Sequence, residues 1–271
     1  MNTKTDVAGV LPAVSTNWSA MVSRALAITY SITCYFIGVA ALVYLILFIA
    51  DMAVPVSLTQ ASPIAPSLFG LEAVLWNVGV LALWGAQHTV MARPGFKRMW
   101  TRIVPPAVER STYLIFVALA TATLVFLWAP LPTVLWDTSG SLVGHVLLGV
   151  YFLGWAIVLF STFLINHFQL FGLQQAYQSN TQVMSKKDVF VTPLLYKMVR
   201  HPMMTGVLIA LWAVPTLTVS RLVFNIVMTS YVFIGLYFEE KTLVAELGDE
   251  YREYRKTTPS VIPGLRPDAR R

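Results

Sequence analysis

The chain has 271 residues, of which 56% are hydrophobic and only 12% are charged, and its net charge is +6. In soluble domains about a quarter of the residues are charged, so this composition excludes an ordinary water-soluble enzyme. The single cysteine, Cys34, also excludes a framework of disulfides within the chain. Most of the chain is therefore expected to lie in lipid.

Long apolar runs predict an all-α fold, a polytopic bundle of membrane helices. Windows of about twenty apolar residues suit a spanning helix. The last two windows are short and are joined by a segment that contains Pro215, so they form either a tight hairpin or one broken, partly buried pair. We therefore expect five or six spanning segments, drawn from residues 26–50, 70–91, 111–129, 142–166, 203–219 and 222–238.

The same pattern divides the chain into three parts. Residues 1–25 form a polar N-terminal segment without the pattern of a cleaved signal peptide. Residues 26–166 hold the first four predicted helices and are expected to form the region through which a substrate enters. Residues 167–271 hold a polar loop, the last two apolar windows and a charged tail, and are expected to form the catalytic region.

Basic residues predict the orientation, because Lys and Arg concentrate in cytoplasmic loops. If the N-terminus is cytoplasmic, Arg221 is the only basic residue on the outer side. The two longer outer loops, 51–69 and 130–141, contain Asp51 and Asp137 and no basic residue. We expect an integral protein of a bacterial inner membrane with both termini cytoplasmic. The basic face would attract anionic lipid, and no nucleic-acid partner is needed to explain it.

Two polar clusters flank the predicted hairpin, and the hairpin would bring them to one cytoplasmic pocket. Arg200 offers a forked, permanently charged donor to a carboxylate, and Pro202 opens a helix whose first N–H groups are free. Glu239 and Glu240 can accept hydrogen bonds from a ribose diol or an amine. These clusters make Arg200, His201, Pro202, Glu239, Glu240, Tyr251 and Tyr254 candidate cofactor-binding residues.

Each cluster also has a plainer interpretation. Arg200 and His201 can cap a helix end at the interface, and the two glutamates can form a solvated helix end. Tyr251 and Tyr254 are three residues apart on a predicted helix, so they share a face and can serve packing as well as ligand contact.

Several motifs resemble the isoprenylcysteine carboxyl methyltransferase superfamily. Residues 190–206, with Arg200-His201-Pro202, resemble its cofactor segment, and residues 239–263 resemble its C-terminal signature. Residues 87–94, 104–113 and 166–173 are similar to the NnrU-related branch, which includes methanethiol S-methyltransferases. The chain departs from the superfamily pattern at Met204, where a Tyr is usual, and at Leu194-Leu195, where many relatives have Gly-Pro.

The resemblance implies S-adenosylmethionine as cofactor, with Leu195, Tyr196 and Gly206 as further cofactor-binding residues, and a small volatile thiol as substrate. Methanethiol would be methylated to dimethyl sulfide, with S-adenosylhomocysteine as the second product, and hydrogen sulfide would be a further acceptor. A thiol with a pKa of about 8.5 or higher is mostly protonated at neutral pH, so a base or a nearby cation is needed. The catalytic candidates are His88, His167 and Arg110, with His201 a further possible base, and His88 is the first choice because it ends the second predicted helix beside Gln87.

Alternatives remain at this point. A structural, hydrogen-bonded role is as good an interpretation for each of the histidines. The NnrU-related branch also resembles membrane proteins that bind haem, for which His88 and His167 could serve as axial ligands. Two further interpretations are a methyltransferase that acts on an isoprenylcysteine carboxylate or a lipid amine, and a membrane scaffold without enzymatic activity. No metal site is predicted, since the sequence has no Cys/His set with zinc spacing.

Overall fold

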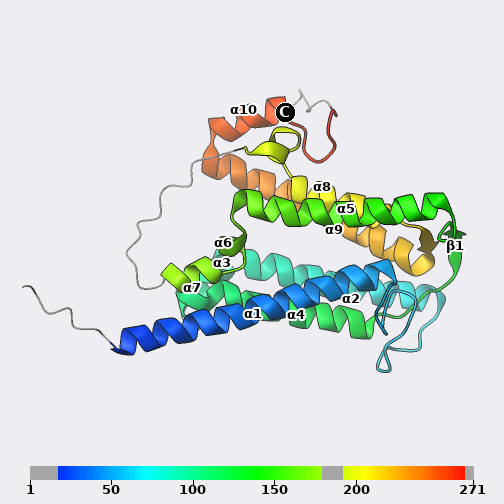
Figure 1. The fold of residues 1–271 in the computed structure, drawn as a ribbon, viewed down its shortest axis with the longest axis horizontal. Coiled ribbons are helices and arrows are strands. Elements are labelled where there is room, and N and C mark those ends of the chain that lie inside the picture. Colours follow the sequence, from blue (N-terminus) through cyan, green and yellow to red (C-terminus); the bar gives the residue numbers. More distant parts are fainter. Residues whose placement is uncertain (1–17, 179–191, 266–271) are drawn as a thin grey trace, which may run out of the picture.

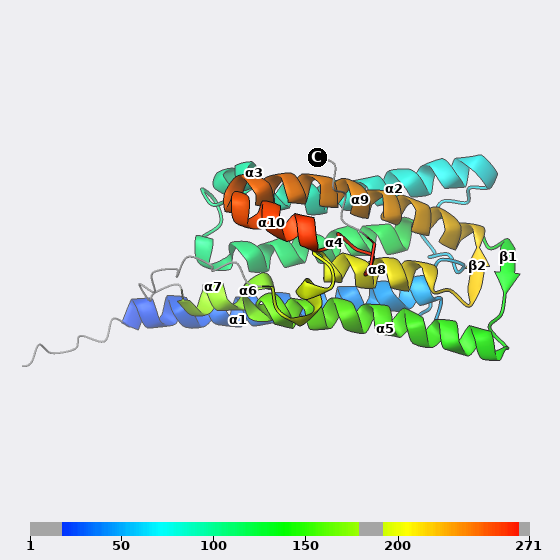
Figure 2. The same ribbon diagram turned by 90° about the horizontal axis from the view of Figure 1, so that it is seen from above.

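The structure is a computed structural model that describes residues 18–178 and 192–265, and its long helices run side by side along one axis (Figures 1 and 2). Residues 1–17 of the predicted N-terminal segment and residues 179–191 of the predicted loop lie outside the described residues. The long helices are α1 (Trp18–Ala50), α2 (Gly70–Ala92), α4 (Glu109–Leu127), α5 (Leu142–Ile165) and α9 (Val219–Leu247).

Shorter elements connect these helices. At one end of the bundle lie α3 (Pro94–Trp100), η1 (Pro106–Val108), α6 (His167–Leu170), α7 (Leu173–Gln178), η2 (Leu194–Lys197) and α10 (Asp249–Thr257). At the other end two strands, β1 (Val134–Asp137) and β2 (Thr216–Thr218), form an antiparallel pair. A helix of intermediate length, α8 (Pro202–Trp212), lies against α5.

Four described helical segments are long and apolar enough to cross a membrane, which confirms the helical membrane bundle. They are Met21–Ala50, Pro106–Leu127, Leu142–Ile165 and Val219–Leu247. Helix α2 matches the predicted window 70–91 and has 23 residues, but Glu72, Asn77, Gln87 and His88 make it less apolar.

The window 203–219 is a broken element, the second of the two forms expected. Helix α8 has 11 residues, and the chain then continues through Pro215 into β2. Proline has no backbone N–H and does not continue a helix. The three residues after Pro215 therefore pair as a strand, β2, with β1, which precedes α5. The last long helix, α9, therefore returns the chain to the end at which α8 began.

Close contact between α5 and α8 depends on two glycines. A Cβ at Gly206 would lie 2.5 Å from the carbonyl oxygen of Gly154, and a Cβ at Gly154 would lie 2.6 Å from that of Gly206. Small residues let helix backbones approach in this way in membrane proteins. Gly206, predicted to bind cofactor, therefore faces α5 and serves this packing.

The core is fullest near the strand end. Trp128 is 1% exposed and makes edge-to-face contacts with Phe48 and Phe224, at ring separations of 6.3 and 5.9 Å. Nearby, the side-chain amide of Asn77 donates to the carbonyl of Ala129 at 2.7 Å and accepts from its N–H at 2.9 Å. These contacts fix the strand end, and the opposite end holds the polar clusters.

Candidate functional site

An ion pair joins the beginning of α8 to the end of α9. The Nε and Nη2 of Arg200 donate to Oε1 of Glu240 at 2.8 and 2.5 Å, and Nη1 donates to the carbonyls of Arg255 and Thr258 at 3.2 and 2.5 Å. The side chains of Arg200 and Glu240 are only 9% and 15% exposed. Four of the five N–H groups of this guanidinium are thus used inside the protein.

The segment after α10 closes over this pair. The backbone N–H groups of Arg200 and His201 donate to the carbonyls of Pro259 and Ser260 at 2.8 and 3.0 Å. The hydroxyl of Thr205 donates to the carbonyl of Val261 at 2.7 Å. The two motifs predicted to share one pocket are therefore joined by backbone as well as by side chains.

His201 lies between the two glutamates. Its Nε2 is 3.2 Å from Oε1 of Glu240, its Nδ1 is 3.7 Å from Oε2 of Glu239, and the residue is 6% exposed. Glu239 by contrast is 49% exposed, and Arg255, whose Nε is 3.3 Å from Oε2 of Glu240, is 40% exposed. One carboxylate and one guanidinium of the cluster are thus accessible to a ligand.

Three tyrosines support the cluster as neutral groups. The hydroxyl of Tyr254 donates to the carbonyl of Tyr196, and the rings of Tyr251 and Tyr254 are 5.8 Å apart. Burial raises the pKa of Tyr196 and of Tyr254 to about 12 and also raises the pKa of Tyr251. At neutral pH these side chains contribute hydrogen bonds and packing, not charge.

The cluster suits a ligand that carries both an ammonium and a carboxylate. Glu239 is an accessible acceptor for an ammonium, and Arg255 is an accessible donor for a carboxylate. Leu195 and Tyr196 lie in η2, just before Arg200, where they can border such a ligand. Arg200 and Glu240 bind each other, so their effect on a ligand would be to hold these groups in place.

His88 belongs to a second cluster, formed by α2, α4 and α9. Its Nδ1 is 2.9 Å from the carbonyl of Trp84, so Nδ1 carries the proton, and in the neutral ring Nε2 keeps a lone pair. The ring lies 3.9 Å from that of Trp84 and 6.4 Å, edge to face, from that of Tyr113. The hydroxyl of Tyr231 on α9 is 3.1 Å from that of Thr89.

His167 has both ring nitrogens engaged. The hydroxyl of Thr162 donates to the carbonyl of Leu159 at 2.6 Å, so it accepts from Nδ1 of His167 at 2.8 Å. The Nε2 atom then accepts from the hydroxyl of Tyr35 at 3.0 Å. The residue is 4% exposed and stacks on Phe163. Both ring nitrogens of His167 thus have partners within the protein, and one of these contacts would have to break before His167 could accept a proton or bind a haem iron.

Arg110, the third catalytic candidate, holds a loop. Its Nη1 donates to the carbonyl of Gln169 at 3.1 Å, and its Cβ lies 2.9 Å from the position that a Cβ at Gly172 would take. This hydrogen bond ties α4 to the short helix α6, which also carries His167.

Sequence reasoning missed three residues of these clusters. Arg255 lies four residues after Tyr251 and so on the same face of α10, which was a usable signal. Tyr113 lies beside His88, and Tyr231 lies beside Trp84 and Thr89, only because α4 and α9 pack on α2. No spacing within the sequence indicates that contact.

These features define a polytopic helical membrane protein with an ion-pair cluster at one end of its bundle. The chain is 41% identical over 245 residues to methanethiol S-methyltransferase 2 of Bradyrhizobium diazoefficiens, which covers 90% of this chain and 93% of the relative. It is 42% identical over 242 residues to methanethiol S-methyltransferase of Mycobacterium tuberculosis, which covers 89% and 97%. The chain therefore belongs to the methanethiol S-methyltransferase family.

A more distant likeness extends to nurim of Bos taurus, with 28% identity over 171 residues, 60% of this chain and 64% of that protein. No protein-family model matches the chain, and no solved structure matches it significantly. Membership of a methyltransferase family implies a methyl donor, and the apolar helices make the protein an integral membrane protein.

Proposed function

We propose that the protein transfers the methyl group of S-adenosylmethionine to methanethiol, giving dimethyl sulfide and S-adenosylhomocysteine. The observation that carries the proposal is the likeness, over about nine tenths of the chain, to proteins named methanethiol S-methyltransferase. Hydrogen sulfide, which carries the same S–H group without the methyl, would be a second acceptor. Residues 167–271 would hold the cofactor, and residues 26–166 would admit the thiol.

The ion-pair cluster would bind the polar groups of the cofactor. Glu239 would accept hydrogen bonds from the ammonium, and Arg255 would donate to the carboxylate, because both remain accessible. Arg200, His201 and Glu240 would keep those two groups in place. When bound, S-adenosylmethionine supplies an electrophilic methyl group on a sulfonium.

His88 would be the base for the thiol. Because its Nδ1–H is held by the carbonyl of Trp84, the lone pair of Nε2 is available to take the proton of an acceptor. The rings of Trp84 and Tyr113 surround the imidazole with apolar surface, which suits a small apolar thiol and excludes water. Transfer of a methyl group is an in-line displacement, so the chain's main task is to position the two reactants.

The cluster end of the bundle would face the cytoplasm. Arg24, Arg93, Lys97, Arg110 and Lys241 lie toward this end, whereas Arg221 is the basic residue at the strand end among the described residues. Positive residues favour the cytoplasmic side of an inner membrane. The beginning of α1 and the end of α10 share the cluster end, which supports cytoplasmic placement of both termini.

Headspace gas chromatography tests the reaction directly. Purified, detergent-solubilised protein given S-adenosylmethionine and methanethiol should release dimethyl sulfide. Glu239→Gln should weaken binding of S-adenosylmethionine roughly tenfold in equilibrium dialysis, because a charge-assisted hydrogen bond is lost. Glu246→Gln, which changes an exposed acid on the same helix, is the matched control and should bind normally.

Each failure has a separate meaning. Cofactor binding without dimethyl sulfide would disprove the thiol and direct attention to a lipid amine or an isoprenylcysteine carboxylate. Absence of cofactor binding, together with a Soret band in the purified protein, would replace the proposal by the haem reading. Normal binding by Glu239→Gln would remove Glu239 from the site.

A further inference from the structure

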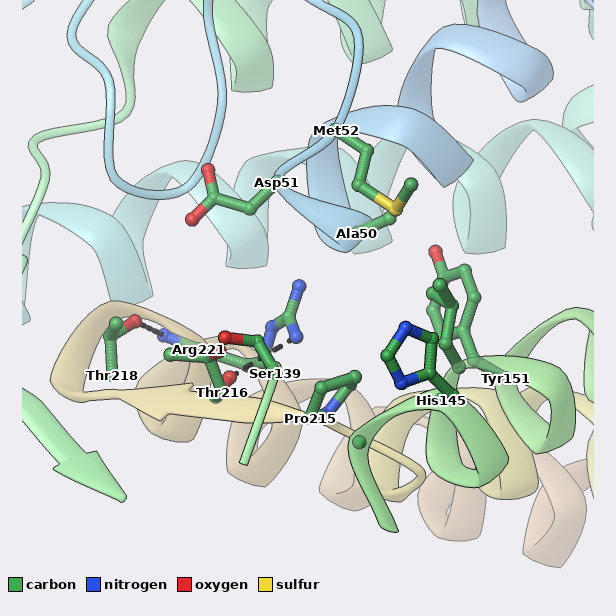
Figure 3. Close-up of a pocket in the computed structure, with 12 residues that line it drawn as sticks. Ala50, Asp51, Met52, Ser139, His145, Tyr151, Pro215, Thr216, Thr218 and Arg221 are labelled. Atoms are coloured by element: carbon green, nitrogen blue, oxygen red, sulfur yellow. Dashed lines mark hydrogen bonds between the residues drawn. The ribbon is translucent and has the colours of Figure 1, made fainter. Parts of the chain in front are cut away.

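A cavity lies at the strand end of the bundle, far from the Arg200–Glu240 pair. Its volume is about 340 Å³, within the range of small-molecule pockets. It is bordered by the end of α1, the beginning of α5 and the segment that leads through β2 into α9 (Figure 3). The proposed methyl transfer uses none of its residues.

Opposite charges line this cavity from different segments. Asp51 and Met52, which follow α1, lie on one side in Figure 3, and Arg221 of α9 lies on the other with its guanidinium directed into the space. Arg221 is 4% exposed, whereas Asp51 is exposed. Among the described residues no ion pair within 4.0 Å joins the two side chains, although both line the same cavity.

Hydrogen bonds within the protein hold Arg221 and Asp51 in place but leave each side chain with further hydrogen-bonding capacity. Arg221 donates from Nη1 to the carbonyl of Thr216 at 3.2 Å and from Nη2 to the carbonyl of Ile49. The second bond places the guanidinium at the C-terminal end of α1, where a positive charge is favourable. These bonds use two of its five N–H groups. One carboxylate oxygen of Asp51 accepts from the hydroxyl of Thr59 at 2.7 Å, and the carboxylate keeps further acceptor capacity.

His145 adds an acceptor beside the cavity. Its Nδ1 lies 2.7 Å from the carbonyl of Ser141, so Nδ1 carries the proton and Nε2 of the neutral ring is an acceptor. The imidazole points from the first turn of α5 toward the cavity (Figure 3). The cavity therefore offers one cationic hydrogen-bond donor, Arg221, and two acceptors, Asp51 and His145.

We propose that this cavity binds the headgroup of a zwitterionic phospholipid, with its phosphate at Arg221 and its primary ammonium at Asp51 and His145. A ligand with both charges satisfies two groups that do not reach each other, and a simple anion would leave Asp51 repelling it. Three of the membrane-spanning segments begin or end beside the cavity, so it lies where a bilayer presents its headgroups.

Native mass spectrometry of the full chain in detergent tests this assignment. Short-chain phosphatidylethanolamine should bind more tightly than phosphatidylglycerol of the same chain length, which has a phosphate and no ammonium. Asp51→Asn should reduce the affinity for phosphatidylethanolamine roughly tenfold. It should not weaken, and should if anything strengthen, the binding of phosphatidylglycerol, because it removes the negative charge that repels this anion. Glu72→Gln, an exposed acid at the same end but outside the cavity, is the matched control.

Met52→Trp provides a second test, because a larger side chain at this partly exposed position would fill the cavity. It should lower the binding of phosphatidylethanolamine, and it carries the test by itself if Asp51→Asn does not fold. Equal affinity of the wild type for the two lipids, or unchanged binding by Met52→Trp, would overturn the proposal. Glycerophosphoethanolamine binding as tightly as the lipid would overturn the membrane source and assign the site to a free zwitterion.

Discussion

Arg200 donates two hydrogen bonds, from Nε and Nη2, to the same oxygen of Glu240, and this contact holds the beginning of α8 against the end of α9. Both side chains are largely buried, and Nη1 of Arg200 also binds the carbonyls of Arg255 and Thr258. One guanidinium thus joins three segments that are distant in the sequence. Arg200 of the Arg-His-Pro motif therefore stabilises the fold of this chain, independently of any ligand.

The first prediction concerns the stability that this pair provides. Arg200→Ala and Glu240→Ala should each lower the free energy of unfolding by about 3 kcal/mol, because each leaves a partly buried charge without its closest charged partner. The double variant should lose less than the sum of the two, since it leaves no unpaired member. Chemical denaturation in detergent, followed by tryptophan fluorescence, measures all three.

The exposed pair Lys256–Glu253 is the control for this cycle. Its atoms are 2.5 Å apart, but both side chains are about 70% exposed (68% and 70%). Lys256→Ala should therefore cost less than about 1 kcal/mol. Strict additivity in the Arg200 and Glu240 cycle would show that the two residues act separately.

The second prediction separates a base from a structural histidine. His88→Gln should lower kcat about 100-fold at pH 7 while leaving the affinity for S-adenosylmethionine unchanged, because a general base contributes roughly that much. The loss should shrink as the pH rises toward the thiol pKa, above about 8, because more thiolate is then present without a base. Rates measured by headspace chromatography across this range decide the matter.

Thr89→Val is the matched control for His88, since it removes only the hydroxyl that contacts Tyr231. It should leave kcat within a few-fold of the wild type. A deficit of His88→Gln that stays equally large at every pH would mean that the imidazole positions α2 and does not accept the proton.

The helices could be predicted from the sequence because apolar length alone specifies them. The windows 26–50, 111–129, 142–166 and 222–238 correspond to α1, α4, α5 and α9, although α9 continues to Leu247. Sequence could not reveal that β2 replaces the second half of the window 203–219, because its partner strand begins at Val134, far away in the chain.

The candidate site was predictable in part, because its residues belong to two motifs that flank the predicted hairpin. The motifs placed Arg200, His201, Glu239 and Glu240 in one cluster, and the structure brings them together. The identity of each partner was not predictable, since it depends on packing between α8, α9 and α10. Contact of Gly206 with the cofactor remains a prediction, and its measured neighbours belong to α5.

The third prediction is a pH dependence of stability caused by His167. Burial lowers the pKa of His167, because the ring is enclosed as a neutral group that donates to Thr162 and accepts from Tyr35. The unfolded chain then binds a proton more readily than the folded chain, so stability is complete above the unfolded pKa of about 6.5 and falls as the pH drops below it.

Unfolding midpoints of the wild type should therefore decrease between pH 7 and pH 5. His167→Gln, which cannot take up the proton, should be less stable at pH 7 and should lose much of this slope. His145→Gln is the comparison, because His145 is exposed and its Nδ1 binds only a local backbone carbonyl, that of Ser141. Equal slopes in the wild type and in His167→Gln would exclude His167 as the cause.

The fourth prediction tests the close approach of α5 and α8. Gly206→Ala places a methyl group 2.5 Å from the carbonyl oxygen of Gly154 and 3.0 Å from Val158. The Gly154 oxygen belongs to the helix backbone, so relieving the clash requires a shift of the helices. Such overpacking should cost about 1–3 kcal/mol of stability. The movement of α8 that relieves the clash would also displace Arg200, which lies two residues before that helix begins, so binding of S-adenosylmethionine should weaken.

Gly235→Ala makes the same chemical change without the contact. Gly235 lies within α9, and a Cβ there would meet nothing within 4 Å. Alanine favours a helix over glycine by about 0.5–1 kcal/mol, so this variant should be as stable as the wild type or slightly more stable. Thermal unfolding of the two variants in the same detergent gives opposite shifts if the α5–α8 contact is as close as the structure shows. A Gly206→Ala protein with an unchanged midpoint would mean that the two helices separate easily.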